Sequence, residues 1–123
     1  MELNHGGLES LVMNVLWENS EEFNGLMSVT QVWEKLNALN TKKKWAYTTV
    51  KTILDRLSDK GLINKVKEGK KYNYEILVPR LELAEKALKK VALEYFQNDF
   101  MEMTKFVKEL AYEEEKNLVG IYK

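Results

Sequence analysis

The sequence has no cysteine, one histidine and one proline among its 123 residues. Without cysteine it can form neither disulfide bonds nor thiolate metal sites, and it has no cysteine nucleophile. The one histidine, His5, lies near the N-terminus, where chain ends are commonly mobile. A histidine-based catalytic or zinc site therefore has almost nothing to build on, and we expect neither a metal nor a cofactor.

Long hydrophobic runs are also missing: none approaches the roughly 20 residues that a membrane-spanning helix needs. Met1 is followed by Glu2 and Asn4 rather than by the basic and then apolar residues of a signal peptide. The sequence contains no glycine-rich phosphate loop and no set of nucleophile and base. These absences predict a soluble, cytoplasmic protein that is not an enzyme.

Charge of both signs is abundant and unevenly distributed, although the 19 basic and 19 acidic side chains cancel. Residues 1–41 carry one lysine against six glutamates, a net charge of −5. Residues 42–71 carry ten basic against three acidic side chains, a net charge of +7. A lysine-rich surface is often simply solvated, so the number of these charges alone does not indicate a partner. Their position along the chain is what indicates a nucleic-acid partner.

Apolar residues recur with helical spacing in three segments before residue 61. They predict a helix over about residues 8–18, a second helix capped by Ser28, and a third over about residues 46–60. Lys60 and Gly61 supply the cation and the left-handed residue that commonly end a helix. Residues 19–27 are predicted to form a loop.

Beyond the third helix the hydrophobic period changes from 3.6 to 2. Residues 62–67 and 71–77 are predicted strands, and residues 68–70 form the turn of a β-hairpin between them. A basic connection, residues 37–44, leads into the third helix. Three helices followed by a hairpin predict a mainly α fold with a small β-hairpin, a winged helix-turn-helix domain of residues 1–78.

Val78 and Pro79 mark a joint, because proline restricts the residue before it and favours a helix start just after it. Two or three amphipathic helices are predicted in a second domain, residues 79–123, with the acidic run 113–115 beginning the last one. Such helices cannot enclose a core alone, so their apolar sides must pack on the first domain or on another chain. We expect another chain, and thus a homodimer, rather than packing on the first domain or a ligand pocket. The residues expected at the dimer interface are Leu88, Val91, Tyr95, Met103, Phe106, Val107 and Leu110.

The outward face of the third helix is short and polar at its N-terminal end. With Val50 toward the core, an ideal helix places Thr48 and Thr52 outward and Lys51 and Arg56 on opposite flanks. Threonine hydroxyls and methyls can contact base edges, and the basic flanks suit the two phosphate strands of a major groove. An ordinary solvated helix face is the simpler alternative.

Two acidic residues, Asp55 and Asp59, share this face. Since a carboxylate in a groove is repelled by phosphate, we expect both to be salt-bridged rather than to read bases. Trp45, at the helix entry, is equally compatible with packing and with a phosphate contact. The lysines of the predicted hairpin suit phosphate, because a flexible ammonium group acts as a point charge; they are Lys65, Lys67, Lys70 and Lys71.

Residues 45–63, WAYTTVKTILDRLSDKGLI, resemble the recognition helix of the penicillinase repressor family, which includes BlaI, MecI and the related CopY copper repressors. Residues 12–17 and 67–74 resemble the first helix and the wing of that family, and the resemblance covers about residues 8–110. It implies a dimeric bacterial repressor whose winged helices bind a palindromic operator. The DNA-contacting residues that it implies are Trp45, Thr48, Thr49, Lys51, Thr52, Arg56, Lys67, Lys70 and Lys71.

Members of that family respond to different signals. Copper-responsive members carry a cysteine-rich metal motif, which this sequence lacks, so copper sensing is not expected. Lactam-responsive members are cleaved before a phenylalanine, typically after asparagine, and the nearest counterpart here is the bond between Lys105 and Phe106. By this resemblance a membrane sensor protease is a candidate partner. The alternative function is a winged-helix protein-interaction module without operator specificity.

Overall fold

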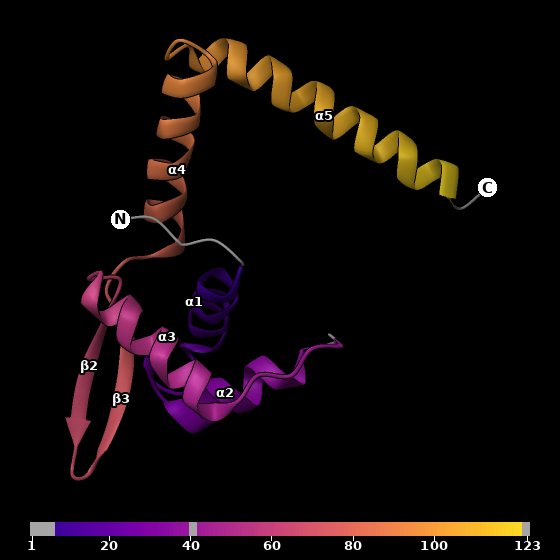
Figure 1. Ribbon diagram of the computed structural model, residues 1–123. Helices are drawn as coiled ribbons and strands as arrows, with labels where there is room; N and C mark the ends of the chain where they lie inside the picture. Colours follow the sequence, from indigo (N-terminus) through magenta and orange to yellow (C-terminus); the bar gives the residue numbers. More distant parts are fainter. Residues whose placement is uncertain (1–6, 40–41, 122–123) are drawn as a thin grey trace. The chain divides into compact units, whose positions relative to one another are not determined.

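The computed structural model describes residues 7–39 and 42–121, which form two compact units, one up to Leu83 and one from Ala84 (Figure 1). His5 lies outside the described residues. The elements of the first unit are α1 (Leu8–Asn19), β1 (Leu26–Ser28), α2 (Val29–Ala38), α3 (Tyr47–Asp59), β2 (Ile63–Glu68) and β3 (Lys71–Ile76). Figure 1 shows the β2–β3 hairpin extending beyond the three helices as a wing. The predicted winged-helix fold is therefore confirmed.

Local sequence signals fix the ends of the helices that lead to the wing. The hydroxyl of Ser28 accepts from the Gln31 N–H at 3.2 Å, and the Gln31 side chain accepts from the Ser28 N–H at 2.9 Å, a complete capping box for α2. After α3, Gly61 has a φ of 81°, a left-handed conformation that costs glycine little. Both predicted signals are confirmed.

The sheet has three strands in the order β1-β3-β2, all antiparallel. β1 pairs Met27 with Tyr74, and β2 pairs Lys65 with the same tyrosine. The prediction that residues 19–27 form only a loop is thus wrong at its end, and the predicted two-stranded hairpin gains a third strand. A strand of three residues is too short for a period of 2 to be read, and only its pairing with the distant β3 defines it.

The core of the first unit lies between the three helices and the inner face of the sheet. It buries the predicted helical stripes together with Tyr74 of the wing. Full burial of an aliphatic side chain stabilises a fold by roughly 1.5–3 kcal/mol, so the stripes supply most of the driving force. The fully buried side chains are Val12, Met13, Leu16, Met27, Val32, Leu36, Val50, Leu54, Leu57, Leu62, Ile63 and Tyr74.

One charged residue of α1, Glu9, is buried in this unit, with 2% of its surface exposed. Its carboxylate oxygens accept from the Lys60 ammonium at 2.6 and 3.1 Å. Lys60 thus joins the end of α3 to α1, beyond its predicted role as a cation at a helix C-terminus. Removing Lys60 would leave the buried Glu9 carboxylate without this ion pair.

The second unit contains α5 (Phe100–Ile121) and most of α4 (Arg80–Tyr95). Gln97 and Asn98 turn the chain between the helices with positive φ angles, and the Asp99 carboxylate caps α5 through the Met101 and Glu102 N–H groups. The prediction that residues 113–115 begin a separate last helix is wrong, since they lie inside α5. Glutamate is a good helix former, so this run continues the helix.

Most apolar side chains of the second unit are exposed. Met103 and Ala92 are buried, and the rings of Phe96 and Phe106 lie 5.7 Å apart. The other residues expected at a dimer interface lie at the surface, and these are Leu88, Val91, Tyr95, Phe106, Val107 and Leu110. No helix among the described residues is both long and apolar enough to cross a membrane.

Candidate nucleic-acid interface

The outward face of α3 is built by its own helical period. Val50, Ile53, Leu54 and Leu57 bury one side of the helix, so the side chains between them face solvent. Of the predicted DNA-contacting residues, the structure exposes all five on α3: Thr48, Thr49, Lys51, Thr52 and Arg56. We refer to these five residues as the outward face of α3.

The outward face holds small polar groups between longer cations. The Thr52 hydroxyl donates to the Thr48 carbonyl at 2.9 Å, so its oxygen remains available as an acceptor. Lys51 lies beside Asp55 at 3.1 Å, and about half of its side chain is exposed. The short threonines permit a close approach of another surface, while the cations at the flanks can reach further.

The entry to α3 is fixed by side chains of α2. The Trp45 carbonyl accepts from the Trp33 indole N–H at 2.9 Å and from the Asn37 amide at 3.0 Å, and the Trp45 N–H donates to Asn37 Oδ1 at 2.9 Å. The Trp45 ring is half-buried against the core, with the Lys43 ammonium 5.9 Å from its centroid. This arrangement supports the packing alternative for Trp45, and its phosphate contact stays a prediction.

Asp55 ties α3 to the wing. Its Oδ1 accepts from the Tyr74 hydroxyl at 2.8 Å and from Lys65 at 3.2 Å, and its Oδ2 accepts from Lys51. Burial raises the pKa of Asp55, but hydrogen bonds from Tyr74, Lys51 and Lys65 outweigh this and hold the pKa below 3.8. Burial and the bond to Asp55 raise the pKa of Tyr74 well above 10.

The prediction that Asp55 is salt-bridged is therefore confirmed. The same prediction for Asp59 is wrong, because this exposed residue has no ion pair with any residue in the described part of the chain. The Tyr74 bond was not predicted from the sequence. The one signal for it is the alternation of β3, which turns Tyr74 inward and leaves its hydroxyl in need of a buried partner.

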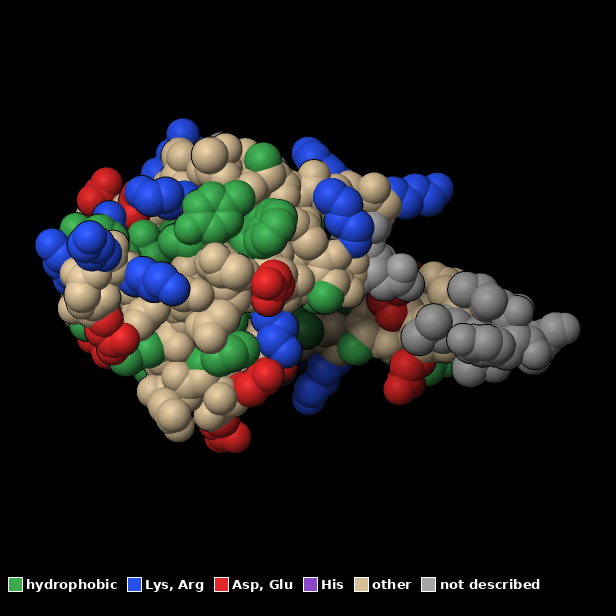
Figure 2. Space-filling model, turned by 90° about the horizontal axis from the view of Figure 1, so that it is seen from below, with side chains coloured by type: hydrophobic (Ala, Val, Ile, Leu, Met, Phe, Trp, Pro, Cys, Tyr) green, Lys and Arg blue, Asp and Glu red, His purple; other side chains and the backbone are tan. Residues whose placement is uncertain are grey.

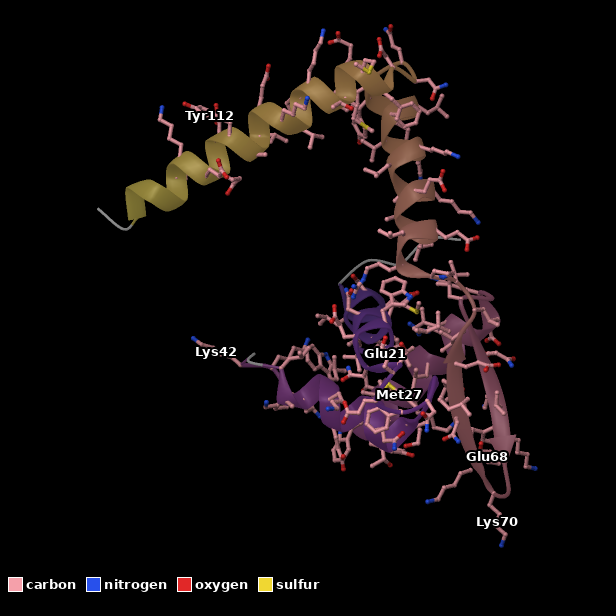
Figure 3. All side chains as sticks on the ribbon, turned by 180° about the vertical axis from the view of Figure 1, so that it is seen from behind. Glu21, Met27, Lys42, Glu68, Lys70 and Tyr112 are labelled. Atoms are coloured by element: carbon pink, nitrogen blue, oxygen red, sulfur yellow. The ribbon has the colours of Figure 1, made fainter. Side chains whose placement is uncertain are left out.

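The wing and the connection before α3 add further cations. Lys67, Lys70 and Lys71 are exposed, and the Lys65 ammonium lies 4.3 Å from the centroid of the Tyr72 ring. Figure 3 shows Lys42 and Lys70 at two extremities of the first unit, both pointing away from it. Figure 2 shows one face on which basic and acidic side chains surround exposed hydrophobic ones. The exposed lysines of the wing and of the connection suit a polyanionic partner.

The groups on this surface are suited to binding rather than to metal coordination. Across residues 7–39 and 42–121, no group of three or more histidine, aspartate or glutamate residues could hold a metal ion. Exposed hydroxyls and ammonium groups around a polar helix can bind and orient a charged partner.

Comparison with known proteins agrees with this geometry. The model of the penicillinase repressor family matches residues 5–122. The chain belongs to the penicillinase repressor family. This family is one of transcriptional repressors rather than of enzymes.

Two bacterial proteins are similar to this chain in sequence. The chain is 37% identical over 78 residues to the transcriptional regulator BlaI of Mycobacterium tuberculosis, covering 63% of this chain and 51% of that protein. It is 38% identical over 52 residues to an uncharacterised 16.5 kDa protein in the ptsI 3' region of Latilactobacillus sakei, covering 42% of this chain and 36% of that protein. The chain thus spans about half or less of the length of the curated relatives it matches.

Among solved structures, this penicillinase repressor family member is similar to the DNA-binding domain of the repressor BlaI in solution. The TM-score is 0.50 at 26% sequence identity, and the match covers 67% of this chain and 93% of that domain. The first unit therefore has the winged-helix fold of a BlaI-type DNA-binding repressor.

Proposed function

We propose that two copies of this chain form a repressor that binds a palindromic operator. In each copy the outward face of α3 enters the major groove, and Lys67, Lys70 and Lys71 contact the flanking phosphates. The main support for this proposal is the set of exposed threonines on α3, Thr48, Thr49 and Thr52. Lys51 and Arg56 lie at the flanks of the same helix, in a unit that resembles the BlaI DNA-binding domain. Occupation of the operator would exclude RNA polymerase, and no bond of the protein would be made or broken.

The homodimer is supported by the apolar side chains exposed along α4 and α5. Leu88 and Tyr95 of α4 are 52% and 75% exposed, and Val107 and Leu110 of α5 are 51% and 48% exposed. Exposed apolar side chains that recur at helical spacing are typical of an interaction site. A two-fold dimer would also place two identical reading helices on the two halves of an inverted repeat. Since such a repressor acts on the bacterial chromosome, we assign it to the cytoplasm.

Release of the operator is a separate question, and the resemblance makes a membrane sensor protease the candidate partner. The bond before Phe106 would be the counterpart of the family's cleavage position. Lys105 and Phe106 are both exposed, but their peptide bond lies inside the 22-residue helix α5. Cleavage there would require local opening of the helix first.

The proposal is tested by gel shift with DNA from upstream of the protein's own gene. We expect this DNA to bind at least about 10³-fold more tightly than scrambled DNA of the same length at physiological salt. We also expect a log-log salt slope near −5, as for about six neutralised phosphates. Equal binding of both DNAs would reject the proposal and favour the protein-interaction module.

Two substitutions distinguish the recognition of bases from the general attraction to phosphate. Thr52→Ala should reduce discrimination at one base pair by about 1–3 kcal/mol and leave binding to scrambled DNA unchanged. Lys70→Ala should weaken binding to both DNAs by a similar factor and reduce the salt slope by about 1. If Thr52→Ala weakened binding to both DNAs equally, the threonine would not be recognising a base.

A further inference from the structure

One carboxylate joins the reading helix to both strands of the wing. Asp55 of α3 accepts from Tyr74 of β3 at 2.8 Å and from Lys65 of β2 at 3.2 Å. Its second oxygen accepts from Lys51, one turn earlier on α3. Tyr74 is fully buried and Lys65 also lies against the Tyr72 ring, so two of the donors are themselves held in place.

A carboxylate at this position opposes the attraction of α3 for DNA. It lies on the helix that approaches phosphates, and its charge offsets that of Lys51 and Lys65. A surface selected only for attraction would not need it. Charge-assisted hydrogen bonds to an ionised acceptor are, however, stronger and shorter than neutral ones, so Asp55 can fix the orientation of the elements that it joins.

Orientation matters because phosphate contacts set the register of a reading helix. If the wing is rigid relative to α3, its lysines reach the flanking phosphates only where α3 also meets its bases. If the wing is free to move, its lysines can reach phosphates of any sequence. Rigidity therefore turns a general attraction into a selective one.

We propose that Asp55 is a positioning residue for operator recognition, which fixes the wing against α3 through Tyr74 and Lys65. It lowers the affinity for DNA in general and raises the preference for the operator. The inference rests on the proposed function, since it concerns how the same surface selects its DNA.

The chain offers a matched control in Asp59. Asp55→Asn and Asp59→Asn each remove one negative charge from α3, but only Asp55 has partners among the residues described. We measure binding of both variants to the upstream fragment that the wild-type protein prefers and to scrambled DNA of equal length. Both variants should bind scrambled DNA more tightly, and Asp55→Asn by the larger factor, because it also frees the lysines of the wing. The ratio of operator to scrambled affinity should fall about tenfold for Asp55→Asn alone, the size of one lost base contact.

Tyr74→Phe is the second variant, because it keeps the ring in the core and removes only the donor to Asp55. We expect a loss of about threefold in the same ratio, with weaker hydroxyl-radical protection of the sugars under the wing. Thermal melting shows whether each variant is folded, and Tyr74→Phe decides the question if Asp55→Asn does not fold. The affinity ratio and the hydroxyl-radical protection would both stay at their wild-type values if the carboxylate only stabilised the domain.

An equal ratio for Asp55→Asn and Asp59→Asn would overturn the inference, as would an unchanged ratio in folded Tyr74→Phe. A wild-type protein without preference for any upstream DNA would overturn the proposed function, and with it this inference. A fall of the ratio in Asp55→Asn with no fall in Asp59→Asn supports it.

Discussion

The two units of this chain use their apolar residues in opposite ways. In the first unit the stripes of three helices and the inner face of the sheet close on one another, so Leu36, Leu54 and Tyr74 have no exposed surface. In the second unit the stripes of α4 and α5 remain largely open, with Tyr95 and Val107 at the surface. Both units have helices of good amphipathic pattern, but only the first can enclose a core.

This contrast shows that pattern alone does not determine which residues are buried. A helical stripe becomes a core only if other stripes surround it, and two helices provide too few. We expect the first unit to owe its stability to its own core and the second to owe much of its stability to a second chain. The stability of the second unit should then depend on protein concentration, and that of the first should not.

The largest effect is expected from a cavity in the first unit. Leu54→Ala removes a fully buried side chain of α3 and should lower the free energy of unfolding by about 2–5 kcal/mol. Urea unfolding followed by tryptophan fluorescence measures this, because Trp17, Trp33 and Trp45 all lie in the first unit.

The matched change in the second unit is Leu88→Ala, which truncates a half-exposed leucine of α4. The free energy of unfolding measured by tryptophan fluorescence should then change by less than about 0.5 kcal/mol. A loss as large as that of Leu54→Ala would show that the two units do not differ in the way we describe.

The next effect in size concerns association through α5. Val107→Asp places a charge in the apolar stripe and should weaken the proposed dimer by about a hundredfold, since burying an unpaired carboxylate is costly. Sedimentation equilibrium measures the dissociation constant. We expect operator binding to weaken with it, because two half-sites are then held by two separate chains.

Tyr112→Asp is the control for this change. Tyr112 lies nine positions after Met103 on α5, which places it about 180° from the stripe at 100° per residue. Tyr112 is 67% exposed, and its replacement should leave the dimer intact. Equal dissociation by both variants would argue against the stripe as the interface.

The smallest effect is the pH dependence of the first unit. The pKa of Asp55 is depressed by folding, so its contribution to stability is present above about pH 4 and is lost as the pH falls further. The pKa of Tyr74 is raised, so the folded state loses stability as the pH rises above 10, where the unfolded tyrosine ionises.

Urea unfolding across this pH range, followed by tryptophan fluorescence, measures both limbs. Tyr74→Phe should remove part of the alkaline loss, because phenylalanine has no proton to release in the unfolded state. An alkaline limb identical to that of the wild type would contradict the assignment to Tyr74.

Much of the fold could be predicted from the sequence because its signals are local. The capping of α2 by Ser28 and the end of α3 at Gly61 depend on residues within one helical turn. The exposed and buried sides of α3 follow from the helical period alone. The same period defines the outward face, so this part of the candidate site was predictable from neighbouring residues.

The features that the sequence did not predict depend on residues far apart in the chain. β1 is defined by its pairing with β3, and the buried Glu9 forms its ion pair with Lys60 at the end of α3. The bonds from Lys65 and Tyr74 to Asp55 likewise arise from the packing of the wing on α3. Asp55 and Asp59 look alike in sequence, and the packing of the wing gives partners only to the first.

The hydrogen bonds from α2 to the Trp45 backbone affect which residues near α3 can change without altering its orientation. Because Trp33 and Asn37 of α2 hold both the carbonyl and, through Asn37, the amide of Trp45, the start of α3 is set by α2 rather than by the connection before it. An exposed lysine of the connection such as Lys42 can then be gained or lost without rotating the helix that follows. The charge of the connection and the orientation of α3 can therefore change independently of each other.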